Sequence, residues 1–248
     1  MIQLSKRLQA VADLVTEKGV LADIGTDHGY IPIYLVQKGR ISGAIAADIK
    51  EGPLLRAKEH IEKYDLGAYI ETRLSDGAKK IAPQEAQILV LAGMGGGLMQ
   101  RIIRQSKEVF FAAEEVILQP QSEQEALRRY LIGEGFEILA EDMVKEDGKY
   151  YPMMRVFVKR KEREEGSDRK DPYENARDIS FLYGAYLLES RHPVLRDFLE
   201  REEKIYTDLL EELHSHSQNP GIEKRIFEIE KKRSLTQKAL SEYFCNEI

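Results

Sequence analysis

The sequence has very little cysteine and no long apolar stretch. Its one cysteine, Cys245, cannot form an intramolecular disulfide or supply a cysteine cage for zinc, so we expect a reducing compartment and no metal site. A run of about eighteen apolar residues, the length that a membrane-spanning helix needs, is absent. The N-terminus carries Lys6 and Arg7 but no uninterrupted apolar core, so it is not typical of a signal peptide. These absences predict a soluble, cytoplasmic protein that makes no membrane contact.

An excess of positive charge is also lacking. The formal net charge of the 248 residues is -6, which argues against a protein that coats nucleic acid or an anionic membrane through its overall charge. The acidic excess lies in residues 161–248, whereas residues 1–160 are nearly neutral and can present a local basic face. With 42% hydrophobic and 32% charged residues, the composition is that of a globular chain of one or two domains.

The first 160 residues alternate between short apolar runs and segments of helical periodicity. The run that ends at Asp23 breaks into a turn with Gly25 and Gly29, and a helical pattern follows. This is the strand, loop and helix that open a doubly wound α/β sheet, although a glycine-containing turn without any ligand would look similar. The expected strands are 20–23, 43–49, 69–74, 87–92, 115–119, 136–146 and 150–160, and the last two are expected to pair antiparallel at the sheet edge. The expected helices are 4–15, 31–36, 53–64, one from about 98, and 123–133.

The C-terminal third has a different pattern. Residues 161–172 are all charged, polar, glycine or proline, which predicts a linker. Beyond it, apolar residues step by four and three on both sides of a turn at 215–221, so two helices are expected to fold back as an antiparallel coiled coil. The predicted domains are therefore a sheet domain at 1–160 and a helical coiled-coil domain at 173–248. A monomer and a dimer joined through the coiled coil both remain open.

Acidic and glycine residues follow several of the predicted strands. Because the carboxyl ends of parallel strands share one edge of a sheet, these residues should converge on a ligand site there. Asp48 lies about twenty residues after Gly25, a spacing that suits a carboxylate accepting hydrogen bonds from ribose hydroxyls. Asp76, after the third strand, could accept from the exocyclic amine of a purine. The strand-end residues are Asp23, Gly25, Asp27, His28, Gly29, Asp48, Asp76, Gly77, Gly93 and Met94.

The same residues narrow the choice of cofactor. A dinucleotide site needs glycine where this chain has Asp27, whose charge would repel a pyrophosphate. The glycines at 93–97 lack the Gly-Lys-Ser/Thr that completes a phosphate-binding P-loop. S-adenosylmethionine contains ribose and adenine but no phosphate, and Asp23 or Asp27 could accept hydrogen bonds from its α-amino group. Acidic strand ends therefore favour S-adenosylmethionine over NAD or ATP.

Five motifs in this order carry a resemblance to a known family. LADIGTDHGY, AADIKEGP, LSDG, LAGMGGGLM and ILQPQ resemble the bacterial tRNA (adenine-22, N1)-methyltransferase family, over residues 4 to about 158. The resemblance implies a Rossmann-like class I methyltransferase fold, a C-terminal coiled coil, tRNA as partner and S-adenosylmethionine as cofactor. It also implies which residues bind that cofactor: Asp23, Gly25, Asp27, His28, Gly29, Asp48, Ile49, Asp76, Gly77 and Met94, to which we add Gly93.

A reaction at N1 of adenine makes modest demands on the protein. That nitrogen already has an in-plane lone pair, so alignment with the methyl carbon and favourable electrostatics suffice without a strong general base. The candidates for positioning near the methyl group are Asp27, His28 and Tyr30. Candidate substrate contacts are Gln119 and Gln121, whose amides could bond a base edge, together with Lys6 and Arg7. Two alternatives stay open: methylation of a small molecule or protein, and a non-catalytic S-adenosylmethionine-binding adaptor.

Overall fold

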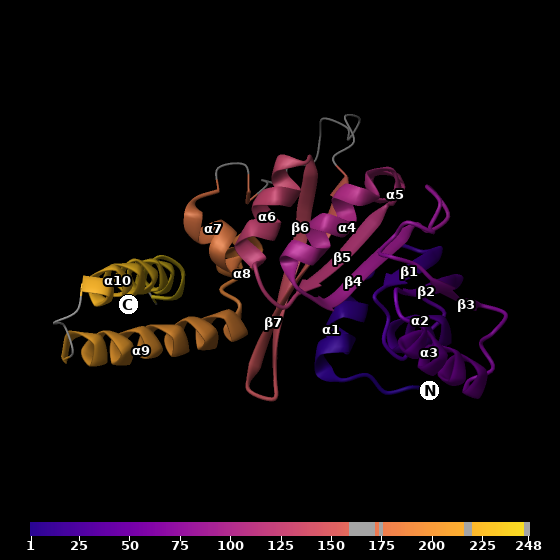
Figure 1. Cartoon of the computed structure of the whole chain (residues 1–248), viewed down its shortest axis with the longest axis horizontal. Coiled ribbons are helices and arrows are strands. Elements are labelled where there is room, and N and C mark those ends of the chain that lie inside the picture. The colour runs from indigo at the N-terminus through magenta and orange to yellow at the C-terminus, as the bar shows by residue number, and fades with distance from the viewer. Residues whose placement is uncertain (159–171, 174–175, 216–219, 246–248) are drawn as a thin grey trace. The chain divides into compact units, whose positions relative to one another are not determined.

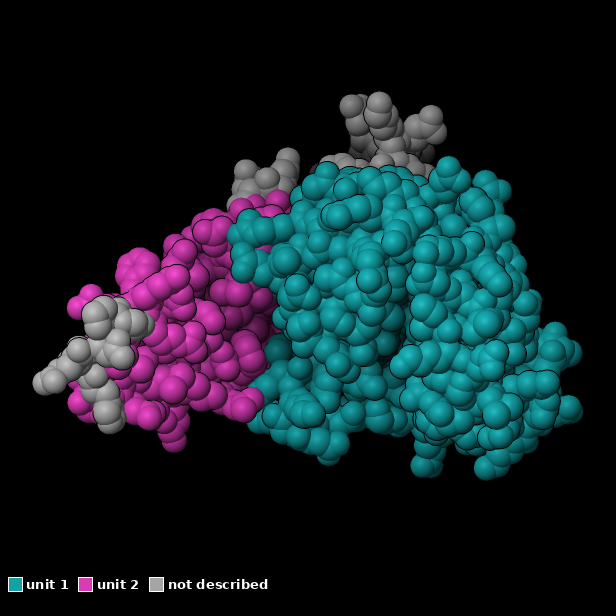
Figure 2. Space-filling view, in the orientation of Figure 1, with its two compact units in different colours: residues 1–169 teal, residues 170–248 magenta. Residues whose placement is uncertain are grey.

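The computed structural model describes residues 1–158, 172–173, 176–215 and 220–245. The chain divides into two compact units, residues 1–169 and 170–248, which Figure 2 shows in different colours. The predicted linker at 161–172 lies outside the described residues except for Pro172, which stands in a turn. The predicted domain boundaries therefore stay a prediction.

Unit 1 is built on a seven-stranded sheet with the strand order β3-β2-β1-β4-β5-β7-β6 (Figure 1). The strands β1 to β5 run parallel, and β7 pairs antiparallel with both β5 and β6. The predicted α/β class, with an antiparallel pair at one edge, is confirmed. The strands are β1 (Val20–Ile24), β2 (Gly43–Asp48), β3 (Ile70–Leu74), β4 (Ile88–Met94), β5 (Glu115–Pro120), β6 (Phe136–Glu146) and β7 (Lys149–Val158).

Six helices among the described residues of unit 1 accompany the strands. They are α1 (Lys6–Asp13), α2 (Tyr30–Gln37), α3 (Glu51–Lys63), α4 (Gly96–Gln105), α5 (Lys107–Ala112) and α6 (Gln124–Gly133). Each expected helix is present, with ends shifted by a few residues, and α4 begins at Gly96 before the first apolar position of its pattern. Helix α5 was not expected, because its six residues are too few to show a helical period.

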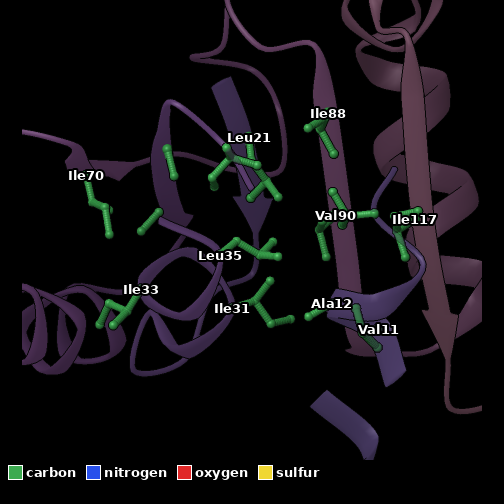
Figure 3. Packing of buried hydrophobic residues seen from close by; sticks show 14 of the residues in the cluster. Val11, Ala12, Leu21, Ile31, Ile33, Leu35, Ile70, Ile88, Val90 and Ile117 are labelled. Carbon is green, nitrogen blue, oxygen red and sulfur yellow. The ribbon is translucent and has the colours of Figure 1, made fainter. Parts of the chain in front are cut away.

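The core explains why the central strands are continuous apolar runs. One cluster joins Val11 of α1 and Ile31 and Leu35 of α2 to Leu21 and Val90 of the sheet (Figure 3). Side chains alternate across a strand, so the fully buried neighbours at positions 89 and 91 belong to the opposite face. Both faces are therefore covered, as in other parallel sheets, and the carboxyl ends of the strands are left for a ligand.

Unit 2 is helical throughout most of its described residues. It contains α7 (Asp178–Tyr183), α8 (Ala185–Glu189), α9 (Pro193–Ser215), α10 (Pro220–Ala239) and a π-helical end, η1 (Leu240–Phe244). Helices α9 and α10 pack against each other as the predicted hairpin. The buried hydroxyl of Thr236 lies 2.9 Å from the hydroxyl of Tyr183, a polar contact between α10 and α7. No helix within the described ranges is both long and apolar enough to cross a membrane.

Candidate functional site

A pocket of about 290 Å³ opens at the carboxyl ends of β1 and β4. Its wall combines the start of α1, the end of β1 with the loop into α2, the last residues of β4, and the residue that follows β5. The lining residues are Arg7, Leu8, Asp23, Gly25, Thr26, Asp27, His28, Tyr30, Ile31, Ala92, Gly93 and Gln121. Most of the residues singled out after the first strand thus lie on one pocket, which is where a doubly wound sheet binds its ligand. Gly29 and Met94, which were also predicted for the cofactor, adjoin the lining without being part of it.

The first half of the β1–α2 loop is anchored to the neighbouring strand. The backbone N–H groups of Gly25 and Thr26 both donate to the carbonyl oxygen of Ala47, at 2.8 and 2.9 Å. Gly25 has a φ of +80°, and a Cβ there would lie 2.7 Å from the Cε of Met94. Glycine is therefore required by the backbone conformation, while the Met94 methyl group is the end of a flexible side chain that can move aside.

Asp23 is a buried carboxylate on the pocket wall. Only 6% of the residue is exposed, and its Oδ2 accepts a hydrogen bond of 2.6 Å from the hydroxyl of Thr26. Burial raises the pKa of Asp23 from 3.8 to about 6, the Thr26 hydrogen bond opposes that rise, and the charge of Asp48 adds to it. An ionised carboxyl group in this position is short of positive charge, so a cationic ligand would be favoured beside it.

The second half of the loop carries a cluster of rings and charges. Asp27 Oδ1 accepts from Arg56 Nη2 at 2.8 Å and lies 3.5 Å from His28 Nε2. The rings of His28, Tyr30 and His60 stack on one another, with centroids 5.0 to 5.3 Å apart. His28 has a φ of 68°, in the left-handed region that costs a non-glycine residue energy. Arg56 and His60 come from α3 and were not anticipated from the sequence.

The remaining predicted cofactor residues follow β2 and β3 along the same sheet edge. The Asp48 carboxylate accepts from the backbone N–H of Lys50 at 2.7 Å, and the Ile49 side chain beside it is 59% exposed. Asp76 pairs with Lys79 at 2.5 Å, and that hydrogen bond lowers the pKa of Asp76. None of these residues lines the pocket itself, and neither does Gly77, which has a φ of +60°. Because β2 pairs with β1 and β3 with β2, they extend the edge of the pocket by one and two strands.

The glycines after β4 do not form an anion cradle. Gly97 N–H donates to the carboxylate Oε2 of Glu123 at 2.9 Å, so a carboxylate already occupies the N-terminus of α4. A Cβ on Gly96 would lie 2.8 Å from the carbonyl oxygens of Ser122 and Glu123. These glycines let the β5–α6 loop approach the backbone. Because the Glu123 carboxylate occupies the N-terminus of α4, that end of the helix is unavailable to a phosphate.

The four predicted substrate residues have different surroundings. Arg7 and Gln121 both line the pocket, beside Gly93. Gln119 is fully buried behind Arg7: its Oε1 accepts from Arg7 Nη1 at 2.9 Å. Lys6 is exposed and outside the pocket lining. The structure thus brings Arg7 and Gln121 to the pocket, with Gln119 orienting Arg7.

The described part of the chain contains no group of three or more histidine, cysteine or acidic side chains that could hold a metal ion. The two carboxylates on the pocket wall bond to other partners instead, Asp23 to Thr26 and Asp27 to Arg56. A ligand in this pocket would therefore meet the charged side chains and the rings of His28 and Tyr30.

The chain is similar to known proteins over most of its length. A family described as a methyltransferase domain matches residues 4–154. A tRNA (adenine(22)-N(1))-methyltransferase of Bacillus subtilis (strain 168) is 36% identical over 194 residues, which are 78% of this chain and 78% of that protein. The crystal structure of the B. subtilis M1A22 tRNA methyltransferase is 30% identical, with a TM-score of 0.82 over 97% of this chain and 100% of that chain. A Streptococcus pneumoniae structure in complex with S-adenosyl-L-methionine is 29% identical, with a TM-score of 0.80 over 96% of this chain and 100% of that chain.

Proposed function

Because the chain belongs to the tRNA (adenine(22)-N(1))-methyltransferase family, we propose that it methylates N1 of adenine 22 in tRNA with S-adenosylmethionine as methyl donor. One observation in the structure carries the proposal furthest. The pocket holds the buried carboxylate of Asp23, while the N-terminus of α4 is already occupied by Glu123. Such a site favours a cationic ligand without phosphates, and S-adenosylmethionine has both properties.

The residues at the sheet edge match the parts of this cofactor. Asp23 would accept from the α-amino group, and Gly25 allows the methionine part to approach the backbone. The half-exposed carboxylate of Asp48 would accept from the ribose hydroxyls, and Ile49 and Asp76 would meet the adenine ring and its amine. When bound, S-adenosylmethionine supplies an electrophilic methyl group on a sulfonium.

The pocket wall provides what attack by N1 requires. Asp27 lies close to His28 and is paired with Arg56, so its proposed part is to position this wall, whereas the buried carboxylate of Asp23 favours positive charge in the pocket. The rings of His28 and Tyr30 offer flat surfaces for an adenine, and the amide of Gln121 can bond its edge. N1 normally takes part in base pairing, so the target nucleotide must be extruded into the pocket. Arg7 lies at the same wall and can pair with the phosphate of that nucleotide.

The test uses tRNA from a strain that lacks the enzyme. The purified chain is incubated with this tRNA and S-adenosylmethionine labelled on its methyl group, and the tRNA is digested to nucleosides. We expect label in 1-methyladenosine, and none when adenine 22 of a transcript is replaced by guanine. Label in protein or small molecules instead would establish the alternative substrates. Cofactor binding without any transfer would establish a non-catalytic adaptor.

A further inference from the structure

Helix α3 holds the second half of the β1–α2 loop through Arg56 and His60, which lie one helical turn apart. Arg56 donates from Nη2 and Nε to Asp27 Oδ1, at 2.8 and 3.3 Å. His60 Nδ1 lies 3.0 Å from the carbonyl oxygen of His28, and because a carbonyl only accepts, Nδ1 is the donor. We call Arg56 and His60 the α3 clasp.

The clasp also completes a stack of rings. The planes of His28, Tyr30 and His60 are within 14 to 25° of parallel. His28 and Tyr30 line the pocket, whereas His60 is not part of its lining and contacts both of their rings, with centroids 5.3 and 5.2 Å away. The buried Nδ1 of His28 has no hydrogen-bond partner among the described residues.

The two halves of the loop have separate anchors. Gly25 and Thr26 are bound to Ala47 of β2, which fixes the part proposed for the cofactor. The part that carries the rings bonds to α3 instead, and His28 there adopts a strained left-handed backbone. A change in the clasp should therefore disturb the rings more than the cofactor's cradle.

We infer that Arg56 and His60 are positioning residues for the target base: they hold the rings of His28 and Tyr30 as a preformed stacking surface for the extruded adenine. The inference rests on the proposed function and specifies how the base side of that site is built. Stacking on aromatic rings is the common way in which proteins hold a base taken out of its helix. Rings already fixed in place lose less freedom when the base arrives.

The experiment separates the two contacts of His60. His60→Ala removes both, His60→Phe keeps a ring without the donor, and His60→Asn keeps a donor near Nδ1 without the ring. Arg56→Gln tests the other half of the clasp. Lys58→Ala is the matched control on α3, because Lys58 is exposed and its ion pair with Glu62 lies within the same helix. For each variant, kcat and KM for tRNA, the Kd for S-adenosylmethionine by calorimetry, and the melting temperature are measured.

We expect His60→Ala to lower kcat/KM for tRNA about tenfold, with Kd for the cofactor within about threefold of wild type and an almost unchanged melting temperature. His60→Phe and His60→Asn should each recover part of the lost kcat/KM. The kcat/KM of Arg56→Gln should lie between the values of these two variants and that of His60→Ala. Lys58→Ala should behave as wild type. Wild-type kinetics in His60→Ala would overturn the inference, as would parallel losses in tRNA kinetics, cofactor affinity and melting temperature. A wild-type enzyme that methylates no tRNA would refute the proposed function itself. That result can be told apart from the two outcomes that overturn the inference, because in both of those the wild-type enzyme is active.

Discussion

Replacing Asp23 by asparagine should stabilise the empty protein and weaken its cofactor binding. Burial raises the pKa of Asp23 from 3.8 to about 6. Below about pH 4 the carboxyl group is protonated in both the folded and unfolded states, so its burial as a charge does not lower the free energy of unfolding. Above about pH 6 it is ionised in both states, and the folded state bears a cost of about 3 kcal/mol, at about 1.36 kcal/mol per unit of pKa. The contribution of Asp23 to stability is thus lost as the pH rises from about 4 to above 6.

The Asp23→Asn variant keeps an oxygen that can accept from Thr26 and removes the titration. We expect the variant to be more stable at pH 8 by up to about 3 kcal/mol, less whatever its new amide hydrogens cost when buried. For a unit of this size that is a rise in melting temperature of up to roughly 6 to 12 °C. About half of the penalty already exists at pH 5, so the advantage should shrink by about 1.5 kcal/mol there.

Thermal unfolding of cofactor-free protein at pH 5 and pH 8 measures this difference. Thr26→Val is the opposite control: it removes the 2.6 Å hydrogen bond that favours ionised Asp23, so it should destabilise the protein more at pH 8 than at pH 5. In calorimetry, the affinity of wild type for S-adenosylmethionine should fall by up to about tenfold for each pH unit below about 6. At pH 8, Asp23→Asn should bind the cofactor at least about tenfold more weakly than wild type does. A variant that is less stable than wild type at pH 8, or a difference that does not change with pH, would refute the reasoning.

Three further changes test other parts of the site. Asp48→Ala should abolish cofactor binding in calorimetry, and near-normal affinity would remove it from the site. Gly96→Ala would place a Cβ 2.8 Å from two carbonyl oxygens, so the free energy of unfolding should fall by about 1 to 3 kcal/mol. The control Gly133→Ala has nothing within 4 Å of the new Cβ and should leave the free energy of unfolding unchanged or raise it. Gln119→Leu removes the acceptor for Arg7, so KM for tRNA should rise several-fold while cofactor affinity is kept; an unchanged KM would show that Arg7 needs no support.

The sequence predicted those parts of the site that follow from local patterns. Strands with Asp23 and Asp48 at or next to their last position, and a turn with Gly25, can be recognised within a few residues, and the parallel sheet brings them to one edge. Contacts across long separations could not be recognised in this way. Arg56 is 29 residues from the Asp27 that it bonds, and Glu123 is 26 residues from Gly97. Both lie on elements whose packing depends on the whole fold.

Gln119 shows a second limit of the sequence. All six residues of β5 are buried, so no alternation along the strand indicates which side chains point toward the pocket. An amide two positions from Gln121 therefore looks equivalent to it. In the structure Gln119 bonds Arg7 and the carbonyl of Pro120, whereas Gln121 lies on the pocket wall. The difference arises from the packing of α1 against β5, which no pattern in either segment indicates.

The insertion of β7 between β5 and β6 has a consequence for synthesis on the ribosome. Strand β5 is complete at Pro120, but its pairing partner Met154 to Val156 follows more than thirty residues later, after β6. At about 5 to 20 residues per second, the apolar edge of β5 stays open for roughly 2 to 7 s in every nascent chain. An open edge of this kind invites pairing with other chains. Fragments that end before β7 should therefore aggregate, even though they contain the whole of the proposed cofactor site.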